Sequence, residues 1–383
     1  MSYALDLGPD GDRDPGEAIR AVARDQVDGA IADLDALDAS NAVERVHSAR
    51  KACKKARAAA RLVRPSIGSS YGETNTALRD AARALSPYRD AHALLATFDD
   101  LIAVTSSQIP SGGVGTVRAE LARRARESTR RLDAGHDDVD RARSLLERGR
   151  ELIDDWTLGG PPGDSLAGGL AKTYGRGRSA LVDAIDAPTA DAHHELRKRA
   201  KYTWYHLRLL EPTAPSSLGP LADVWHDLAD GLGDAHDLAV LAAALRGRSD
   251  EGAPDGDDGA REIEGGEGRA AWGAPEVVEA ALVVVDGRRE MLEQRSIALA
   301  RRLLADDVDC FVGRLVACWE VHRRWGPEHP VGEIAEVFDR SDSADELTVA
   351  ELRALAGEAG VVGRWSMARD ELVAVVRAEG VLG

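Results

Sequence analysis

Residues 47–65 read HSARKACKKARAAARLVRP, and residues 194–212 read HELRKRAKYTWYHLRLLEP. Both stretches begin with a histidine, continue with clustered basic residues and end at a proline. When His47 is aligned with His194, 16 of the 50 residues of 47–96 are identical to the residue 147 positions later, without a gap. Because a chance match would not keep one register for so long, we expect two homologous halves, residues 12–156 and 160–326.

Each stretch carries a basic stripe along a predicted helix. At about 100° per residue, five basic side chains of each copy fall within about 100° of one another on the helical wheel. We call these sets ridge 1 (His47, Arg50, Lys51, Lys54 and Arg61) and ridge 2 (His194, Arg197, Lys198, Lys201 and Arg208). The opposite faces carry mostly small or apolar residues: Ala49, Ala52, Cys53, Ala56, Ala60 and Val63 in the first copy, and Leu196, Ala200, Thr203, Leu207 and Leu210 in the second. This pattern predicts that each helix packs its apolar face into a bundle and offers its ridge on the other side.

The two ridges contrast with the rest of the chain, whose formal net charge is -17. Residues 47–61 hold six Lys or Arg residues and no acid, and five of the six lysines of the chain lie in 47–61 and 194–208. Like charges one helical turn apart repel each other, and two such ridges brought together would repel further. A multivalent anion between the ridges would remove this repulsion. The alternative is an ordinary charged face in contact with water.

A second shared element follows each ridge, LSPYRDAHAL at 85–94 and LGDAHDLAVL at 232–241. The alignment pairs Arg89 with His236 and Asp90 with Asp237. These residues either add positive charge to the ridges, with the Asp orienting a ridge residue, or form an ordinary interhelical ion pair. The Arg-rich stretch 118–132 is a further candidate, although its spacing does not settle which arginines point inward. Outside the ridges, the candidate binding residues are Arg57, Arg89 and His236.

Apolar periodicity over almost the whole chain predicts an all-α fold of two bundles. We expect helices at 15–38, 42–64, 74–105, 115–133 and 137–156, and then at 166–186, 190–211, 218–248, 275–305 and 306–325. Asn41, followed three residues later by Glu44, fits a capping box at the start of the second helix. Residues 249–271 are rich in Gly, Asp and Glu, which predicts a mobile acidic insertion to which we assign no function.

Residues 331–383 form a separate small unit with the pattern helix, short extended link, helix. This pattern weakly resembles the helical modules of the Rho N-terminal and SAP type, and a plain helical hairpin is the alternative. The unit holds 11 acidic and 5 basic residues, a poor surface for nucleic-acid phosphates.

Several classes of protein do not fit the composition. No apolar run reaches the roughly 18 residues of a membrane-spanning helix, and residues 1–20 lack the pattern of a signal peptide. The three cysteines, Cys53, Cys310 and Cys318, have no metal-binding spacing and fit reduced thiols. We therefore expect a cytoplasmic protein with no cofactor or metal. We also find no phosphate-binding Gly-rich loop and no nucleophile beside a base, so we expect no enzyme activity.

The twice-written His-x-x-Arg-Lys-x-x-Lys motif, at His47–Lys54 and His194–Lys201, and the paired segments at 85–94 and 232–241 resemble the CHAD family (conserved histidine α-helical domain). The resemblance covers residues 12–326. It implies two four-helix bundles related by a pseudo-twofold axis, with basic helices lining a central groove. It also implies binding of inorganic polyphosphate, in some relatives on polyphosphate granules. Two departures are that Tyr202 and Trp204 stand at the positions of Lys55 and Arg57, and that this sequence lacks the alternating-glutamate strand motif of the triphosphate-tunnel domain that many relatives carry, so we expect no such catalytic partner domain.

The preferred hypothesis is therefore a non-catalytic polyphosphate-binding protein that uses both ridges. The alternative is a nucleic-acid-binding protein, which the basic helices and the C-terminal unit both permit. Ridge 1 has no aromatic residue for base stacking, whereas the helix of ridge 2 has Tyr202, Trp204 and Tyr205. A polyphosphatase is the least favoured reading, because Asp90 and Asp237 are too isolated for phosphoryl transfer.

Overall fold

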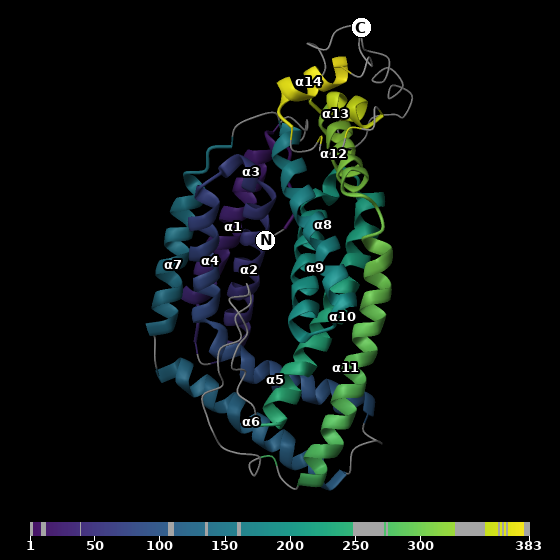
Figure 1. Ribbon diagram of the computed structural model, residues 1–383. Helices are drawn as coiled ribbons and strands as arrows, with labels where there is room; N and C mark the ends of the chain where they lie inside the picture. Colours follow the sequence, from purple (N-terminus) through teal and green to yellow (C-terminus); the bar gives the residue numbers. More distant parts are fainter. Residues whose placement is uncertain are drawn as a thin grey trace.

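The computed structural model describes residues 3–8, 13–38, 40–105, 111–134, 137–158, 162–247, 272, 275–325, 349–358, 361, 364 and 367–378. All regular secondary structure in these ranges is helical, which confirms the predicted all-α class (Figure 1). None of the described helices is long and apolar enough to cross a membrane. The predicted acidic insertion at 249–271 and much of 331–383 lie outside the described residues.

The first bundle consists of α1 (Pro15–Asp35), α2 (Ala42–Leu62), α4 (Ser70–Ala84) and α7 (Asp137–Asp154), with the short α3 (Arg64–Ile67) after α2. Its core is made of small and aliphatic side chains such as Ile19, Val27, Cys53, Leu78 and Leu146, all fully buried. The many alanines of α2 let α1 and α4 approach closely, so α2 is packed on two sides within this bundle.

The second bundle consists of α8 (Pro162–Asp186), α9 (Ala190–Leu210), α10 (Pro215–Leu245), the end of α11 (Pro275–Leu303) and α12 (Val308–Trp325). A short 3-10 helix, η1 (Glu211–Thr213), joins α9 to α10. The core here is aromatic. Tyr174 stacks on Phe311 with ring centroids 3.9 Å apart, and Trp225 and Trp319 are fully buried beside them.

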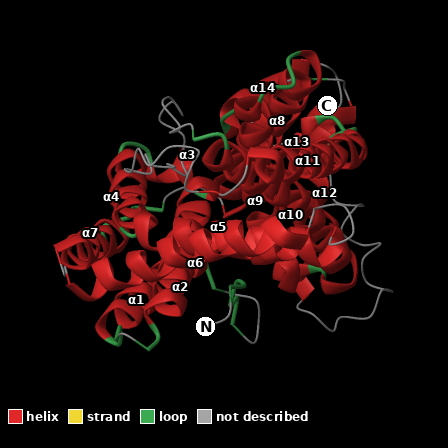
Figure 2. Cartoon of the chain, turned by 90° about the horizontal axis from the view of Figure 1, so that it is seen from below, coloured by secondary structure: helices red, strands yellow, loops and turns green. Residues whose placement is uncertain are grey.

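Two helices, α5 (Ser86–Thr105) and α6 (Ser111–Ala134), leave the first bundle and cross beneath the second (Figures 1 and 2). They pack against the lower parts of α10 and α11 through a separate apolar core that includes Phe98, Leu121, Leu241, Trp272 and Val278. The two bundles are therefore joined by α5 and α6 as well as by the contact between α2, α8 and α9.

The prediction of one helix over 74–105 is wrong. The chain breaks at Leu85, so α4 ends at Ala84 and α5 begins at Ser86. Pro87 explains the break, because it has no backbone N–H for a helical hydrogen bond and its ring clashes with the preceding turn. The equivalent residue of the second half is Asp234, and there α10 continues without interruption, as predicted for 218–248.

The predicted capping box at Asn41 is also wrong, since the Asn41 side chain does not cap α2. Its Oδ1 instead accepts a hydrogen bond from the backbone N–H of Asp38 at 2.8 Å, and its Nδ2 donates to the carbonyl of Ala36 at 3.0 Å. Asn41 therefore closes the turn between α1 and α2, using the local side chain-to-backbone bonds that Asn favours in turns.

The α2–α9 contact joins the two bundles. The Nε2 atom of His206, on α9, lies 3.0 Å from the carbonyl oxygen of Ala58 on α2, and this imidazole is fully buried. The N-terminal segment seals one side of the contact, because the Tyr3 hydroxyl donates to the carbonyl of Lys55 at 3.0 Å and the Leu5 N–H donates to the carbonyl of Leu209 at 3.1 Å.

The described part of the C-terminal unit forms the two expected helices, α13 (Val349–Glu358) and α14 (Arg369–Ala378). They share a small core of Leu352, Ala356, Leu372 and Val376. Arg364 reaches back to α12, where its Nη1 lies 2.8 Å from Oδ2 of Asp309. The unit thus rests against the second bundle, and its resemblance to a Rho N-terminal or SAP module stays a prediction.

Candidate functional site

Ridge 1 lies along α2, and the opposite face of that helix is buried as predicted. Ala49, Cys53, Ala56 and Ala60 are fully buried in the first bundle. On the ridge itself, His47 and Lys51 are exposed, whereas Lys54 and Arg61 are half-buried. The small residues of one face thus hold α2 in place while long basic side chains extend from the other.

Two of the predicted binding residues on this helix, Arg50 and Arg57, are buried. Arg50 is 8% exposed and donates from Nη1 to the carbonyl of Ala82 at 3.2 Å and to the hydroxyl of Ser86. The break after Ala84 leaves the last carbonyls of α4 without helical partners, and Arg50 satisfies one of them.

Arg57 is more completely enclosed, with 1% of its surface exposed. Its Nε donates to Oδ1 of Asn75, on α4, at 3.1 Å. Arg57 therefore joins α2 to α4 in this structure, and its predicted role in binding would require it to reach the surface.

At the start of ridge 1, the Nδ1 atom of His47 accepts a hydrogen bond from Nε of Arg89, on α5, at 3.1 Å. Partial burial lowers the pKa of His47 below its ordinary value, and the charges of Arg89, Lys51, Lys54 and Arg50 lower it further. His47 is therefore held in its neutral form beside four cations. A bound anion would reverse this effect by favouring the protonated ring.

Ridge 2 lies along α9, and the predicted apolar face of that helix is buried against the second bundle. The ring of His194 lies 4.7 Å from that of His236, on α10, between centroids. Three cations of this ridge have carboxylate partners. Lys198 lies 2.5 Å from Glu195, Lys201 lies 3.7 Å from Asp230, and Arg208 pairs with Glu211.

The same pairs of positions meet in both halves. His47 contacts Arg89 as His194 contacts His236, and each of these residues lies 147 positions from its counterpart. Arg50 bonds to Ser86, and the equivalent Arg197 lies against Gly233, where an added Cβ would come within 3.3 Å of Nε. Two copies of one unit would produce this pattern, and the duplication itself stays a prediction from the sequence.

The two ridges approach each other where α2 passes α9. The guanidinium carbon of Arg61 lies 3.9 Å from the centre of the Tyr202 ring, a cation–π contact between the ridge helices. At the equivalent pair of positions, Lys55 faces Arg208. Burial lowers the pKa of Lys55, and Lys51 and Arg208 lower it further. Positive charge from both halves is therefore concentrated at this contact.

Asp90 and Asp237 also come together, from α5 and α10. Burial raises the pKa of Asp90 above its ordinary value, and the charge of Asp237 adds to the increase, while Arg50, Arg89 and Lys54 oppose it. Asp90 thus lies among cations that the sequence assigned to the site. Whether Asp90 and Asp237 orient ridge residues stays a prediction.

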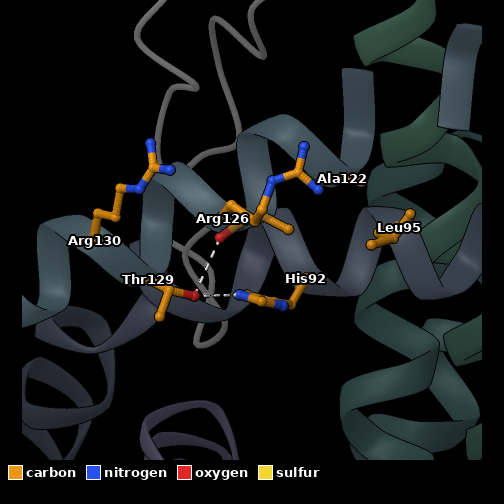
Figure 3. A pocket seen from close by; sticks show the side chains of 7 residues that line it. His92, Leu95, Ala122, Arg126, Thr129 and Arg130 are labelled. Carbon is orange, nitrogen blue, oxygen red and sulfur yellow. Dashed lines mark hydrogen bonds between the residues drawn. The ribbon is translucent and has the colours of Figure 1, made fainter. Parts of the chain in front are cut away.

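A pocket of about 320 Å³ opens between α5 and α6, close to Arg89 in the sequence. It is lined by His92, Leu95, Ala122, Ala125, Arg126, Thr129 and Arg130. Nε2 of His92 lies 2.9 Å from the Thr129 hydroxyl, while the guanidinium groups of Arg126 and Arg130 extend from the same face of α6 (Figure 3).

The structure shows where several arginines of the Arg-rich stretch 118–132 point, which the sequence spacing left open. Arg118 pairs with Asp99, and both Arg123 and Arg124 pair with Glu120. Arg126 and Arg130 line the pocket instead. His92 was missed by the sequence analysis, although it stands one helical turn after Arg89 and therefore on a neighbouring part of the same face.

A family model described as the CHAD domain matches residues 21–246. The chain belongs to the CHAD family. A search of curated proteins found no match. The matched region begins within α1 and ends just after α10, so it contains both ridges and the pocket between α5 and α6. The wider CHAD domain boundary at 12–326 and the division into two halves stay predictions.

Proposed function

We propose that this CHAD protein binds inorganic polyphosphate, without converting it, through ridges 1 and 2. The observation that carries the proposal is the approach of two cationic helices from different halves, with Arg61 on Tyr202 and Lys55 facing Arg208. The lysines of this acidic chain are concentrated in two segments where they repel one another, and a bound polyanion would stabilise that arrangement.

The side chains of the ridges suit a chain of phosphates. Lysine presents a compact ammonium group, whereas arginine presents a fork of N–H donors that matches phosphate oxygens. Lys51 and Lys54 extend from ridge 1, and Lys198 and Lys201 occupy the same positions on ridge 2. A flexible polymer with one charge per phosphate can follow such a surface without a fixed backbone geometry, and counterion release contributes much of its affinity.

The burial of the aromatic residues disfavours nucleic acid as the main ligand. Tyr202 is 7% exposed and Tyr205 is 2% exposed, so neither ring offers a face for base stacking. Trp204 stacks on Tyr205 and lies against His226, with ring centroids 4.6 and 4.2 Å apart, respectively. The helix of ridge 2 thus uses its aromatic residues for packing, which leaves charge as its main means of recognition.

The test is a titration of the purified chain with polyphosphate of defined length at several salt concentrations. If six to ten ridge residues each neutralise a phosphate, the slope of log affinity against log salt is roughly -4 to -7, taking the single-strand value of about -0.7 per contact. We expect polyphosphate binding to survive molar potassium chloride and binding of DNA or RNA to be lost well below it. Tighter binding of nucleic acid than of polyphosphate at high salt would contradict the proposal.

A further inference from the structure

A second group of cations lies beyond the shared motif, where α8 meets the end of α2. Its members are Arg61 on α2, Arg64 on α3, Lys172 and Arg176 on α8, and Arg199 on α9. We call this group the α8 cluster. It includes Lys172, the one lysine of the chain that lies outside the two ridge segments.

Glycines of α8 explain how these side chains come together. A Cβ added to Gly169 would lie 1.8 Å from the carbonyl oxygen of Leu62, so the backbones of α8 and α2 touch at this point. Further along α8, a Cβ on Gly177 would lie 3.7 Å from Cβ of Arg199. Lys172 and Arg176 stand between these two contacts and are one helical turn apart, so both are held near the ends of α2 and the middle of α9.

Two tyrosine rings support the arginines of the cluster. The guanidinium carbon of Arg64 lies 4.5 Å from the centre of the Tyr71 ring, and that of Arg61 lies 5.9 Å from the same ring. Arg61 also lies over Tyr202. These contacts orient the guanidinium groups, since a cation–π contact uses the face of the guanidinium and not the edge that carries its N–H donors.

The members of the cluster interact electrostatically. Burial lowers the pKa of Arg176, and the charges of Arg199, Arg64 and Arg61 lower it further. Burial likewise lowers the pKa of Lys172, with Arg64 and Arg176 adding to the effect. Glu195 pairs with Arg199, so this member of the cluster is bound to a carboxylate. Lys172 and Arg176 are exposed and have no carboxylate partner among the described residues.

The cluster has no counterpart at the positions that the repeat makes equivalent. The residues 147 positions before Lys172 and Arg176 are Asp25 and Gly29, and the residue 147 positions after Arg64 is Glu211. Where Arg64 adds positive charge beside Arg61, Glu211 neutralises the equivalent Arg208. The cluster is therefore not part of the repeated motif and calls for a separate explanation.

We propose that the α8 cluster binds a short run of linked phosphates, and that it holds one end of the polyphosphate chain whose middle lies along the ridges. The inference deepens the proposed function and rests on it. Guanidinium forks and an ammonium group are the kinds of donor that a group of phosphates requires. Because the cluster occurs at one end of the site only, a bound chain would run away from it along ridge 1. The same chemistry would accept free triphosphate.

The experiment measures the binding of triphosphate, which is too short to follow either ridge, by isothermal titration calorimetry. The variant is Lys172→Gln with Arg176→Gln, two exposed side chains whose loss leaves the core intact. The matched control is Arg141→Gln with Arg295→Gln, which removes the same charge from exposed positions on α7 and α11. Circular dichroism checks the fold of both variants.

We expect the cluster variant to bind triphosphate at least ~10-fold more weakly than the parent, and the control to stay within about twofold, as expected for two lost charge-assisted hydrogen bonds. With long polyphosphate, the salt slope of the cluster variant becomes less negative by about 1.4, which corresponds to two lost contacts. An unchanged slope together with weakened triphosphate binding would show that the cluster takes free phosphates rather than the chain end.

Two results would overturn the inference. One is a parent chain that does not bind triphosphate, and the other is a cluster variant that binds triphosphate as tightly as the parent. Neither result bears on whether the ridges bind long polyphosphate, which the parent chain shows separately. Conversely, failure of the parent to bind long polyphosphate would reject the proposed function, even where triphosphate binding depends on Lys172 and Arg176.

Discussion

Ridge 1 and ridge 2 carry the same cations but have different neighbours. In ridge 2, Glu195, Asp230 and Glu211 pair with Lys198, Lys201 and Arg208. The residues at the equivalent positions beside ridge 1 are Ser48, Arg83 and Arg64, none of them acidic. The two ridges thus share their cations, but the residues around them differ and make the surroundings of ridge 1 more positive than those of ridge 2.

This difference indicates that two ridges with the same motif need not contribute equally to the affinity for a polyanion. A cation that already has a carboxylate partner must exchange that partner for a phosphate, so its net gain on binding is smaller. Lys51, the counterpart of Lys198, is exposed and has no carboxylate partner among the described residues, so it gains the full interaction. We therefore expect ridge 1 to contribute more of the affinity for a polyanion than ridge 2, although one ligand contacts both.

The largest expected effect comes from reversing charge on ridge 1. We expect Lys51→Glu with Lys54→Glu to weaken polyphosphate binding by ~100-fold or more, because two attractive contacts become repulsive. The matched change on ridge 2, Lys198→Glu with Lys201→Glu, is expected to cost ~10-fold. Fluorescence titrations with labelled polyphosphate at one salt concentration compare them. Equal losses would remove the distinction between the ridges.

A smaller effect should follow from making ridge 2 resemble ridge 1. Asp230→Arg places at this position the residue type found at the equivalent Arg83, and it releases Lys201 from its partner. We expect polyphosphate to bind ~10-fold more tightly, about the value of one charge-assisted contact. The control Glu279→Arg makes the same change of charge on the exposed side of α11. An equal gain in the control would show that net charge alone explains the result.

The contact between the halves is also unequal, since His206 of α9 is buried there and its counterpart in α2 is Ala59. Burial lowers the pKa of His206 to about 3, whereas the ring in the unfolded chain titrates near its ordinary value of about 6.5. Between these values the unfolded chain binds the extra proton, so stability is lost as the pH falls below about 6.5. The expected loss from this residue is about 1.4 kcal/mol per pH unit.

Denaturant titrations at pH 7, 6 and 5 measure this loss. His206→Gln keeps a donor for the Ala58 carbonyl but does not titrate, so we expect a shallower decline with pH than in the parent. Other histidines, such as His92 and His322, also have lowered pKa values and contribute to both proteins equally. Parallel declines in the two proteins would place the acid sensitivity elsewhere.

The smallest expected effect concerns His47. Its pKa is lowered in the free protein by burial and by four cations, and a bound polyanion raises it. Binding then takes up a proton, so affinity should rise as the pH falls from 8 to 6, by about threefold for a partly shifted group. The same titration with His47→Gln should be flatter. A parent profile as flat as that of the variant would leave His47 as a structural residue.

Periodicity and composition were sufficient to predict much of the fold. The faces of α2 and α9 were predicted correctly because alternating small and basic residues leave one way to pack each helix. The break at Leu85 was missed because the repeat suggested one continuous helix, although Pro87 was visible within the LSPYRDAHAL segment. Pro87, which lacks a backbone N–H, thus breaks the helix here, although the equivalent segment of α10 is continuous.

The sequence predicted the residue types of the site but not which of their side chains are exposed. Arg50 belongs to ridge 1 and Arg57 lies on the same helix, yet both are buried because α4 and α5 cover that side of α2. Conversely, Lys172 and Arg176 were not singled out, since packing contacts such as that of Gly169 with Leu62 are needed to bring α8 beside the ridge. Packing between segments far apart in the sequence decided both outcomes.

The central claim is that both ridges contact one polyphosphate chain. The most direct test compares the salt dependence of binding for Lys54→Gln, for Lys201→Gln and for the double variant. We predict one bound chain per protein, a salt slope less negative by about 0.7 in each single variant, and by about 1.4 in the double variant. A slope that is unchanged in either single variant, or two independent binding events, would contradict the account.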